Sequence, residues 1–467
     1  MDGMQKRRAF DVAALGRALG DAFGERVSRA PAVREQHGRD ESAHPPAPPD
    51  YVVFARSTED VAQAVGICAD FRAPVIAFGA GTSLEGHVQA IHGGVSIDLA
   101  GMDRVIEVRP EDQDVTVEAG ITRKALNHWL RDTGLFFPVD PGADATLGGM
   151  AATGASGTTT VRYGTMRENV LTAKVVLADG SVVTLGSRAR KSSAGYDLLH
   201  LLVGSEGTLG IMTELTLRLH GRPEAVAAGV APFATLEGLV EAVIEAIQCE
   251  VPLARIELLD HLAVMAVNAY AGLANTVAPT LFLEFHGSEP TIAHDLARFE
   301  EIARAHGCTG FEAATMAEGR AKLWKARHEA LYAGRALNPG RIGLITDVCV
   351  PISKLAESIL ATRADLARSG IVAAIVGHVG DGNYHTTLWL DPDDEAGLER
   401  ARGIIERMAE RAIALGGTCT GEHGIGLGKM ALLAREHGDS LAMMRAVKRA
   451  LDPDNILNPG KVLAHPG

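Results

Sequence analysis

The stretch from Asp140 to Gly164, DPGADATLGGMAATGASGTTTVRYG, decides the fold. It is rich in glycine and other small residues, and the sequence predicts one long loop here. A loop of this length inside a compact domain is uncommon and is usually functional. Glycine lets a backbone approach a phosphate closely, but it also serves ordinary turns, so this loop alone leaves both interpretations open.

Two further glycine loops accompany it, one on each side in the sequence. A strand expected at Val75–Phe78 leads directly into Gly79–Ser83, GAGTS. On the C-terminal side, the loop Gly204–Gly210 (GSEGTLG) precedes a strand expected at Ile211–Leu219. Neither loop is a P-loop, because no Gly-Lys-Ser or Gly-Lys-Thr follows, and no GxGxxG opens a long helix after a strand. Three such loops in one domain favour a ligand-binding role over three unrelated turns.

Short strands and one helix alternate closely around these loops, which predicts an α+β domain and not long parallel βαβ repeats. The expected strands lie at 51–54, 75–78, 95–99, 105–108, 115–118, 172–177, 181–185 and 211–219, and the expected helix at 58–69. The proline-rich segment His44–Asp50 cannot form a helix or a central strand, so it marks the start of this domain. A change of composition at Gly221–Pro223 marks its end.

The second half of the chain alternates longer helices with strands. The expected helices lie at 236–248, 292–305, 316–333, 352–369, 395–415 and 441–450, and the expected strands at 281–285, 342–350, 372–376 and 386–390.

Composition excludes several classes of function. With 467 residues the chain is long enough for two or more domains, and 46% hydrophobic and 22% charged residues are typical of a globular protein. A formal charge of −13 argues against a nucleic-acid partner. The five cysteines stand far apart without a CxxC, which indicates reduced thiols and no iron–sulfur or zinc-ribbon site.

The same survey gives an expectation for the location of the protein. The N-terminus MDGMQKRRAF lacks the apolar run of a signal peptide, and no apolar stretch is long enough to span a bilayer. We therefore expect a cytoplasmic protein with no transmembrane segment, with peripheral contact at the inner face of the membrane left open.

Two histidines flank a turn signal in VGHVGDGNYHTTLWLDP, Val376–Pro392. Asp381-Gly382 is a strong signal for a two-residue hairpin turn, and with this dipeptide at the turn centre His378 faces His385. Directly opposed residues place their Cβ atoms roughly 5 Å apart on one face, where two imidazoles can bind one metal ion. For two histidines alone, a hydrogen-bonded structural pair is the simpler interpretation.

A polar, glycine-bounded loop after the last long helix adds candidate ligands. Within GTCTGEHGIGLGK, Gly417–Lys429, Glu422 offers an oxygen ligand and His423 a further imidazole. Two histidines and a carboxylate suit Zn or Mn with open coordination positions. The spacing is not HExxH, so a zinc peptidase has no direct support.

Together, the three glycine loops resemble the FAD-binding domain of the vanillyl-alcohol-oxidase superfamily, FAD-binding oxidase/transferase type 4. The matching words are PVIAFGAGTSLEGH, VDPGADATLGGMAATGASGTTTVRYGTMRENV and VGSEGTLGIMTELTL. In chain order, the first loop is Gly79–Ser83, the second Asp140–Gly164 and the third Gly204–Gly210. The resemblance implies that the first loop binds the FAD pyrophosphate, the second lines the isoalloxazine and diphosphate, and the third follows the adenosine side. The implied FAD contacts are Phe78, Gly79, Ala80, Gly81, Thr82, Ser83, Asp140, Pro141, Gly148, Gly149, Thr153, Ser156, Gly157, Tyr163, Gly164, Glu206, Gly210 and Ile211.

Two details complete the expected cofactor site. The tail LDPDNILNPGK resembles the returning tail of this superfamily, which implies that Asn458 and Lys461 either contact FAD or cap the chain. Some members attach FAD covalently to a histidine of the first loop. Here that loop has none and His87 lies too late, so we expect noncovalent FAD.

The C-terminal half resembles the substrate domain of FAD-linked D-lactate dehydrogenases, D-2-hydroxyglutarate dehydrogenases and glycolate oxidases. LWKARHEALYAGRALNPGRIGLITDVCVPISKL, Leu323–Leu355, is most similar to the mitochondrial-type D-lactate dehydrogenases. The resemblance implies that Arg327 binds the substrate carboxylate, with a structural salt bridge as the alternative. His423, beside Glu422, is the candidate catalytic base. Asn383 is assigned a substrate contact, with steadying of the turn as the alternative. The expected metal ligands are His378, His385 and, chiefly on this resemblance, Glu422.

The implied fold is α+β, with a vanillyl-alcohol-oxidase-type FAD-binding domain of two subdomains and a C-terminal α+β substrate (cap) domain. The expected parts are a helical N-terminal extension at 1–45, the FAD-binding domain at 46–223, the substrate- and metal-binding cap at 224–424, and a C-terminal segment at 425–467 that returns to the FAD-binding domain.

These features predict oxidation of a small D-2-hydroxy acid, with D-lactate favoured, by metal-assisted proton abstraction and hydride transfer to FAD. Positions with further polar contacts in the hydroxyglutarate enzymes are Leu331, Ile345 and Thr387 here, which argues against a second substrate carboxylate. D-2-hydroxyglutarate or glycolate dehydrogenation, a non-oxidative FAD-dependent transferase and a zinc hydrolase are the alternatives. Without a haem or iron–sulfur motif, electrons must leave to a separate acceptor, a quinone, a cytochrome or an electron-transfer flavoprotein. The oligomeric state is left open, a homodimer included.

Overall fold

The chain folds into two compact units. The computed structural model describes residues 10–464, apart from the side chains of Lys322, Lys325, Ala326 and His328. The first unit comprises Met1–Ser156, Thr165–Gly221 and Glu422–Gly467, and the second comprises Gly157–Gly164 and Arg222–Gly421. Two of these boundaries lie two and three residues before the expected domain ends at 223 and 424. The expected N-terminal extension is part of the first unit, and the residues examined for a signal peptide lie almost wholly outside the described range.

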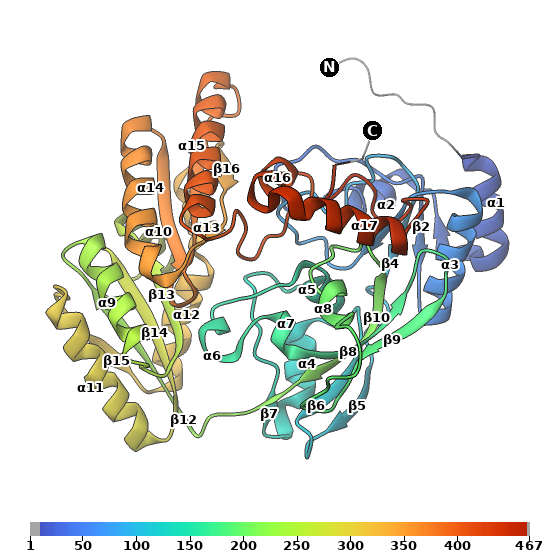
Figure 1. The fold of residues 1–467 in the computed structure, drawn as a ribbon. Helices are drawn as coiled ribbons and strands as arrows, with labels where there is room; N and C mark the ends of the chain where they lie inside the picture. Colours follow the sequence, from blue (N-terminus) through green and yellow to red (C-terminus); the bar gives the residue numbers. More distant parts are fainter. Residues whose placement is uncertain (1–9, 465–467) are drawn as a thin grey trace. The chain divides into compact units, whose positions relative to one another are not determined.

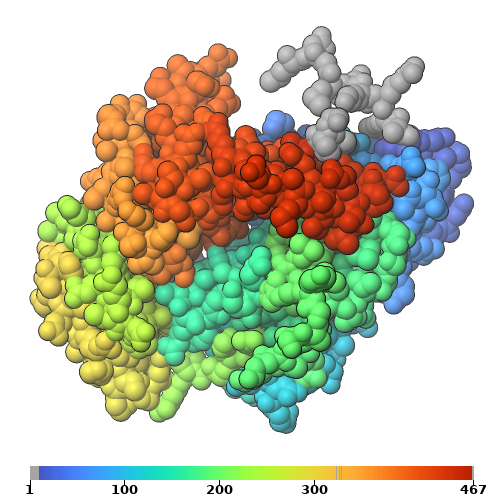
Figure 2. Space-filling view, in the orientation of Figure 1, coloured from blue at the N-terminus to red at the C-terminus, as the bar shows by residue number. Residues whose placement is uncertain are grey.

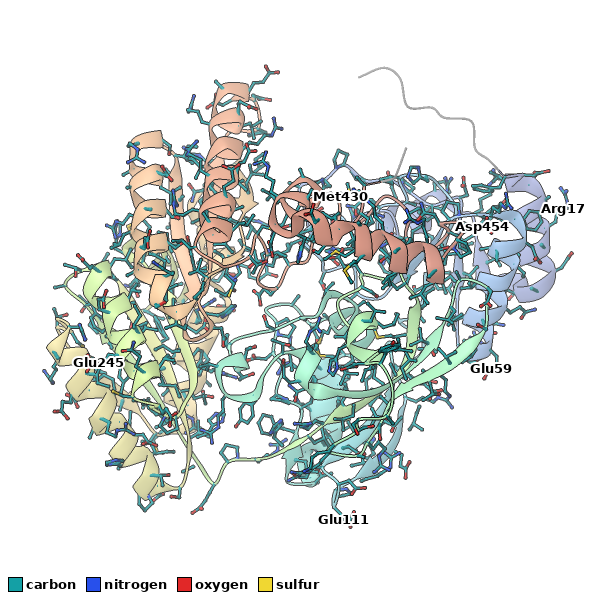
Figure 3. The ribbon with its side chains drawn as sticks, in the orientation of Figure 1. Arg17, Glu59, Glu111, Glu245, Met430 and Asp454 are labelled. Carbon is teal, nitrogen blue, oxygen red and sulfur yellow. The ribbon has the colours of Figure 1, made fainter. Side chains whose placement is uncertain are left out.

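A four-stranded sheet forms one half of the first unit, in the order β1-β2-β4-β3 (Figure 1). Its elements are α1 (Val12–Phe23), β1 (Val27–Ser28), α2 (Pro31–Gln36), β2 (Tyr51–Phe54), α3 (Thr58–Phe71), β3 (Val75–Phe78) and β4 (Val95–Asp98). Leu19 of α1 and Val65 of α3 share one apolar core with the sheet. Helix α3 begins where the sequence predicts because the Ser57 hydroxyl accepts the Asp60 N–H, and Glu59 lies in the positive first turn (Figure 3).

A five-stranded antiparallel sheet forms the other half of the first unit, in the order β5-β6-β10-β8-β9. Its strands are β5 (Val105–Arg109), β6 (Asp114–Glu118), β8 (Val170–Val176), β9 (Val182–Gly186) and β10 (Ile211–Arg218). Strands β7 (Leu135–Phe136) and β11 (His220–Gly221) pair as a separate two-stranded sheet, and the helices of this part are α4 (Arg123–Trp129), α5 (Leu147–Thr153), α7 (Met166–Asn169) and α8 (Leu199–Leu202). Successive side chains of a strand point to opposite faces. Val115 and Val117 accordingly enter the core, whereas Thr116 shares a 3.0 Å hydroxyl hydrogen bond with Thr216.

The glycine-rich stretch Asp140–Gly164 is not the continuous loop that the sequence predicts. It contains α5 and the short helix α6 (Thr160–Tyr163). Thr146 caps α5 by accepting the Gly149 N–H at 3.3 Å, and Met150 of that helix is buried in the core. The two glycines of α5 lower its intrinsic helix propensity, but the cap and the buried face outweigh them.

An eight-stranded antiparallel sheet forms the centre of the second unit, in the order β15-β12-β14-β13-β18-β19-β16, with β17 also paired to β19. Its strands are β12 (Ala225–Pro232), β13 (Leu253–Leu259), β14 (Thr280–Gly287), β15 (Glu312–Ala314), β16 (Ile342–Ile345), β17 (Val348–Cys349), β18 (Val372–His378) and β19 (Asn383–Leu390). Strands β12, β13 and the three-residue β15 were not predicted from the sequence. Alanine, leucine and glutamate in these segments favour helix, and burial between neighbouring strands overrides that preference.

Helices cover both faces of this sheet (Figure 1). They are α6, α9 (Leu236–Gln248), α10 (His261–Ala271), α11 (Glu289–Ala305), α12 (Ala317–His328), α13 (Ala330–Leu337), α14 (Leu355–Ser369) and α15 (Glu395–Ala414). The Tyr384 hydroxyl lies 2.7 Å from Ser358 of α14, so α14 covers one face. Phe282 packs with Trp324 in the cluster that α10, α12 and α13 form on the other face. The one helix expected at 316–333 is therefore two, α12 and α13.

The C-terminal segment belongs to the first unit, and its helices α16 (Met430–His437) and α17 (Leu441–Leu451) lie at the surface (Figure 2). Beyond α17 the chain returns to β3, where the Asn458 N–H donates to the carbonyl of Val75 at 2.8 Å. In residues 10–464, no helix combines the length and the apolar character needed to cross a membrane.

Candidate active site

The hairpin of β18 and β19 carries the two predicted metal-binding histidines. The predicted register is wrong, because His378 pairs with Asn383 and His385 lies opposite Val376. Four residues, Val379–Gly382, connect the strands as a 3₁₀ turn that ends in Gly382 at φ +79°, so the turn is wider than an Asp-Gly dipeptide. His378 is two residues from Val376 and therefore shares a face with His385 as a diagonal neighbour. The ring centroids lie 5.5 Å apart, with the rings nearly perpendicular.

Each of these imidazoles is held through its Nδ1 atom. His378 Nδ1 lies 2.7 Å from Oε1 of Glu257, and His385 Nδ1 lies 3.0 Å from the carbonyl oxygen of Thr346. A carbonyl oxygen and a carboxylate accept, so Nδ1 is the donor in both rings and Nε2 keeps its lone pair. Metal-binding histidines usually show this arrangement, with the second nitrogen tied to a carboxylate or a backbone carbonyl. The pair therefore fits a divalent metal ion.

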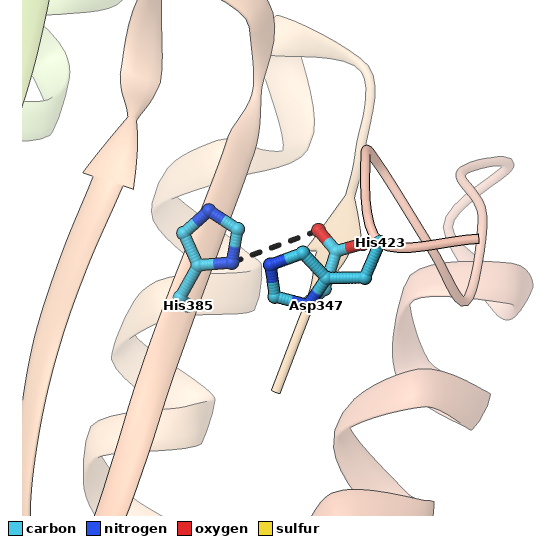
Figure 4. A group of neighbouring side chains, drawn as sticks. All are labelled: Asp347, His385 and His423. Carbon is cyan, nitrogen blue, oxygen red and sulfur yellow. Dashed lines mark ion pairs between the residues drawn. The ribbon is translucent and has the colours of Figure 1, made fainter. Parts of the chain in front are cut away.

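Two buried carboxylates of the second unit, Glu257 and Asp347, were not among the predicted site residues. Glu257 on β13 joins His378 to Arg327, since its second oxygen lies 2.5 Å from Arg327 Nη2. Asp347 lies 3.6 Å from His385 Nδ1 (Figure 4) and accepts hydrogen bonds from Asn383 and Thr420. The available signal was a lone acidic residue inside an apolar strand, RIELL for Glu257 and LITDVCV for Asp347.

The predicted substrate contacts Arg327 and Asn383 both lie in the second unit. The Asn383 amide nitrogen donates to Asp347 at 2.7 Å and to the carbonyl of Val348 at 2.9 Å, which supports the turn. Its oxygen is buried and has no hydrogen-bond partner among the described residues, and neither has Nε of Arg327. Buried polar groups normally have partners, so one acceptor and one donor remain for a ligand.

The predicted ligand Glu422 and the predicted base His423 lie in the first unit, directly after the chain leaves the second. Glu422 accepts a hydrogen bond of 2.8 Å from Ser156. The preceding residue, Gly421, has its Cα against Asn383. An added Cβ would meet the Asn383 amide nitrogen at 2.1 Å, so only glycine fits there.

The first two predicted FAD loops pack against each other in the first unit. A Cβ on Gly79 would lie 2.3 Å from the Thr146 hydroxyl, which caps α5. Beside the first loop lies a cavity of about 330 Å³, lined by Phe78, Ala80 and Gly81 together with Gln36, Arg39, Asp40 and Glu41. Arg39 supplies a cation in this lining, and the sequence analysis did not assign it a role.

Several predicted FAD contacts have a packing role within their own unit. A Cβ on Gly148 would lie 2.6 Å from Ala119, and one on Gly210 would lie 2.6 Å from Val175, so both glycines permit close packing. Asp140 is buried, and Thr153 donates to the carbonyl of Gly149 at 3.1 Å. The contacts of these residues with FAD remain predictions.

The third glycine loop is fixed by a buried carboxylate. Glu206 lies 3.0 Å from His87 Nε2 and accepts the backbone N–H groups of Ile425 and Gly426 at 2.6 and 2.8 Å. Burial raises the pKa of Glu206, but His87 and these N–H groups outweigh it, and the pKa is lowered. The Asn458 amide donates to the carbonyls of His87 and Glu206. The segment that follows the first loop, the third loop and the C-terminal segment are thereby joined.

Three predicted FAD contacts, Gly157, Tyr163 and Gly164, lie in the segment assigned to the second unit. The Tyr163 hydroxyl lies 2.7 Å from His286 Nδ1, and burial raises the pKa of Tyr163. This segment was expected in the FAD-binding domain, and its main contacts are instead with β13.

Residues 49–186 match the family described as FAD binding domain, and residues 222–462 match the family described as FAD linked oxidases, C-terminal domain. The fold and the site define a flavin-dependent oxidoreductase, and the chain belongs to the FAD-linked oxidase family.

Two named relatives refine this assignment. The chain is 52% identical to a probable mitochondrial D-lactate dehydrogenase from Danio rerio, over 99% of this chain and 94% of the relative. It is 45% identical to the mitochondrial D-lactate dehydrogenase (cytochrome) from Arabidopsis thaliana, over 89% of this chain and 73% of the relative. Both names place the relatives in mitochondria, so the cytoplasmic expectation is wrong. It rested on a missing apolar run, whereas mitochondrial targeting segments are amphipathic and arginine-rich and need none.

Solved structures confirm the predicted vanillyl-alcohol-oxidase-type fold. Alkyldihydroxyacetonephosphate synthase matches with a TM-score of 0.75 and 20% identity, over 98% of this chain and 86% of that chain. 4-Ethylphenol oxidase from Gulosibacter chungangensis matches with a TM-score of 0.79 and 19% identity, over 100% and 99%. At these identities the likeness concerns the fold alone.

Proposed function

We propose that the protein oxidises D-lactate to the 2-oxo acid. The observation that carries the proposal is the pair His378 and His385, which share one sheet face and are both held through Nδ1. Beside this pair lies Arg327, a buried cation suited to a carboxylate. The names of the two relatives supply the substrate class. Leu331, Ile345 and Thr387 stand where the hydroxyglutarate enzymes have further polar substrate contacts, which argues against the dicarboxylate 2-hydroxyglutarate.

Three residues, Arg327, Asn383 and His423, act on different groups of the substrate. Arg327 binds the substrate carboxylate with its remaining N–H groups and so fixes the orientation of C2. The Asn383 oxygen accepts the hydrogen bond that the substrate hydroxyl donates before it ionises. His423 then takes the hydroxyl proton, and the hydride leaves C2 as the carbonyl of the 2-oxo acid forms.

His378, His385 and Glu422 would hold a divalent metal ion, Zn or Mn, which supplies Lewis-acid polarisation of the hydroxyl oxygen. Chain connectivity supports the proposed roles of Glu422 and His423, which belong to the first unit. Gly421 lies against Asn383, and consecutive Cα atoms are only about 3.8 Å apart, so Glu422 and His423 follow directly from this end of the hairpin.

FAD bound noncovalently by the three glycine loops would supply the hydride acceptor. The side chain of His87 is buried against Glu206. Because this contact occupies the imidazole, it supports noncovalent binding over a covalent bond between His87 and FAD. Arg39 in the cavity beside the first loop offers a cation for a cofactor phosphate.

The electrons then pass to a separate acceptor, for which we propose a cytochrome because the Arabidopsis relative carries that word in its name. A quinone and an electron-transfer flavoprotein are the alternatives. A second copy of the chain in a homodimer is a further proposal, tested by light scattering.

The test is anaerobic flavin bleaching with D-lactate, L-lactate, glycolate and D-2-hydroxyglutarate, before and after treatment with a chelator. We expect rapid bleaching by D-lactate only, its loss with the chelator, and its recovery when Zn²⁺ or Mn²⁺ is returned. His423→Ala should keep its yellow FAD and slow the bleaching by two to four orders of magnitude, as for loss of a general base. Equal bleaching by L-lactate would contradict the stereochemistry, and no bleaching by any hydroxy acid would favour the non-oxidative transferase.

A colourless protein would instead favour the zinc hydrolase. Acid precipitation tests the cofactor linkage, since noncovalent FAD stays in the supernatant and a yellow pellet would contradict this part of the proposal.

A further inference from the structure

We propose that Glu257 is a positioning residue that couples the metal ligand His378 to the carboxylate-binding Arg327. The inference rests on the proposed function and extends it to a residue that the sequence analysis did not assign. One buried carboxylate sets the hydrogen-bonding state of the histidine and the orientation of the guanidinium at the same time.

The strand register places Glu257 beside His378. Strands β13 and β18 pair with Leu258 opposite Gly377, which puts the preceding Glu257 opposite the following His378. Its side chain is 1% exposed, with Oε1 2.7 Å from His378 Nδ1 and Oε2 2.5 Å from Arg327 Nη2. Arg327 reaches it from α12, so two elements converge on one carboxylate.

The chemistry of the carboxylate explains why both contacts matter. A carboxylate only accepts, so His378 must donate from Nδ1 and present the Nε2 lone pair. On the other side the ion pair holds one edge of the guanidinium and leaves Nε of Arg327 without a partner among the described residues. A neutral amide has one accepting and one donating end and cannot serve both partners.

A second buried carboxylate on the same sheet provides a matched comparison. Glu284 on β14 also lies between a histidine and an arginine, 2.7 Å from His286 Nε2 and 3.5 Å from Arg255 Nη1. The other nitrogen of His286 is engaged by the Tyr163 hydroxyl at 2.7 Å. Both ring nitrogens of His286 therefore contact protein groups, and neither His286 nor Arg255 is a predicted metal ligand or substrate contact.

The principal variant is Glu257→Gln in the FAD-loaded protein. The stronger, charge-assisted bond draws the Gln oxygen to Arg327 and leaves its NH₂ group facing His378 Nδ1. His378 must then accept at Nδ1 and carry its proton on Nε2, where it blocks the metal. We expect about 10- to 100-fold weaker binding of Zn²⁺ or Mn²⁺, the range typical for lost partners of metal ligands. Isothermal titration of chelator-treated protein measures the affinity without relying on turnover, and Glu284→Gln should bind metal as the wild type does.

The double variant Glu257→Gln/Arg327→Met separates positioning from general damage. Without the guanidinium, the Gln oxygen is free to turn to His378 and restore the donating Nδ1. Metal affinity should return to within a few-fold of wild type, while KM for D-lactate rises on the order of 30-fold or more because the carboxylate has lost its cation. A merely structural role predicts no such rescue.

Each outcome bears on one claim. Unchanged metal affinity in Glu257→Gln, equal loss in Glu284→Gln, or no rescue in the double variant would overturn the proposal, as would a wild type that binds neither ion. If Glu257→Gln does not fold, as judged by circular dichroism, the uncharged double variant still gives the comparison with wild type. Failure of D-lactate to bleach the wild-type flavin would instead remove the proposed substrate and leave the metal titration interpretable.

Discussion

Glu206 of the first unit and Glu257 of the second are both buried carboxylates beside a histidine, yet they differ in what surrounds them. Glu206 holds His87 and two backbone N–H groups, none of which is a predicted metal ligand or substrate contact. Glu257 holds only side chains, His378 and Arg327, which are a predicted metal ligand and a predicted substrate contact. Burial of a charge therefore does not identify a functional site.

This difference can be tested by weakening the contacts around Glu206. If the contrast is right, changes there reduce the stability of the first unit, whereas changes at Glu257 reduce ligand binding.

The largest expected effect is that of Glu206→Ala, which leaves His87 and two buried N–H groups without their acceptor. Breaking a buried pair typically costs about 3–5 kcal/mol. For a unit of this size, that corresponds to a fall in Tm on the order of 10 °C, measured by calorimetry of the FAD-loaded protein.

Glu214→Ala serves as the control, because Glu214 pairs with a partly exposed Lys174 in the same unit. Such a pair contributes at most about 1 kcal/mol, and its loss should shift Tm by only a few degrees. Equal effects of the two substitutions would contradict the scaffold role of Glu206.

The sequence allowed much of the first unit to be predicted. Strands β2 and β3 have the expected bounds and helix α3 begins at the expected residue, because each is a short apolar run or an amphipathic stretch between clear caps and turns. The glycine loops carried the family resemblance, since a backbone that must approach a neighbour closely tolerates only glycine. Gly79 against Thr146 is an example.

The second unit shows where sequence reasoning ends. The closeness of His378 and His385 was expected, but the register was not, because Asp381-Gly382 closes a 3₁₀ turn with an αL glycine instead of a two-residue hairpin. Glu257 could not be placed because its partners lie 70 and 121 positions away in the sequence, as 327 − 257 and 378 − 257 show. Only the pairing of β13 with β18 brings them together.

The pair of Glu206 and His87 should also make the stability of the first unit depend on pH. The pKa of Glu206 is lowered from its usual 4.5, and that of His87 is raised from 6.5 because the attraction of Glu206 outweighs burial. The contribution of Glu206 is therefore present above pH 4.5 and lost as pH falls through its folded pKa. That of His87 is present below pH 6.5 and lost as pH rises through its folded pKa.

The stability difference between wild type and Glu206→Gln should accordingly be largest between pH 4.5 and 6.5 and decline on either side. Urea unfolding of the first unit at a series of pH values measures it. Asp40, Glu85 and Lys461 also face this pair and are common to both proteins, so their titration largely cancels in the difference. A difference that does not vary with pH would show that the two groups are not coupled.

The smallest expected effect is that of Asn458, which closes the same scaffold from the C-terminal side. Its amide nitrogen donates to the carbonyls of His87 and Glu206, and its oxygen accepts from Lys461, whose pKa burial lowers to about 8. Its φ of +40° adds a backbone requirement that asparagine meets better than alanine. Asn458→Gly removes only the amide and should cost about 2 kcal/mol, whereas Asn458→Ala should cost about 1 kcal/mol more because of the backbone. A larger loss of unfolding free energy in Asn458→Gly than in Asn458→Ala would contradict a backbone requirement at Asn458.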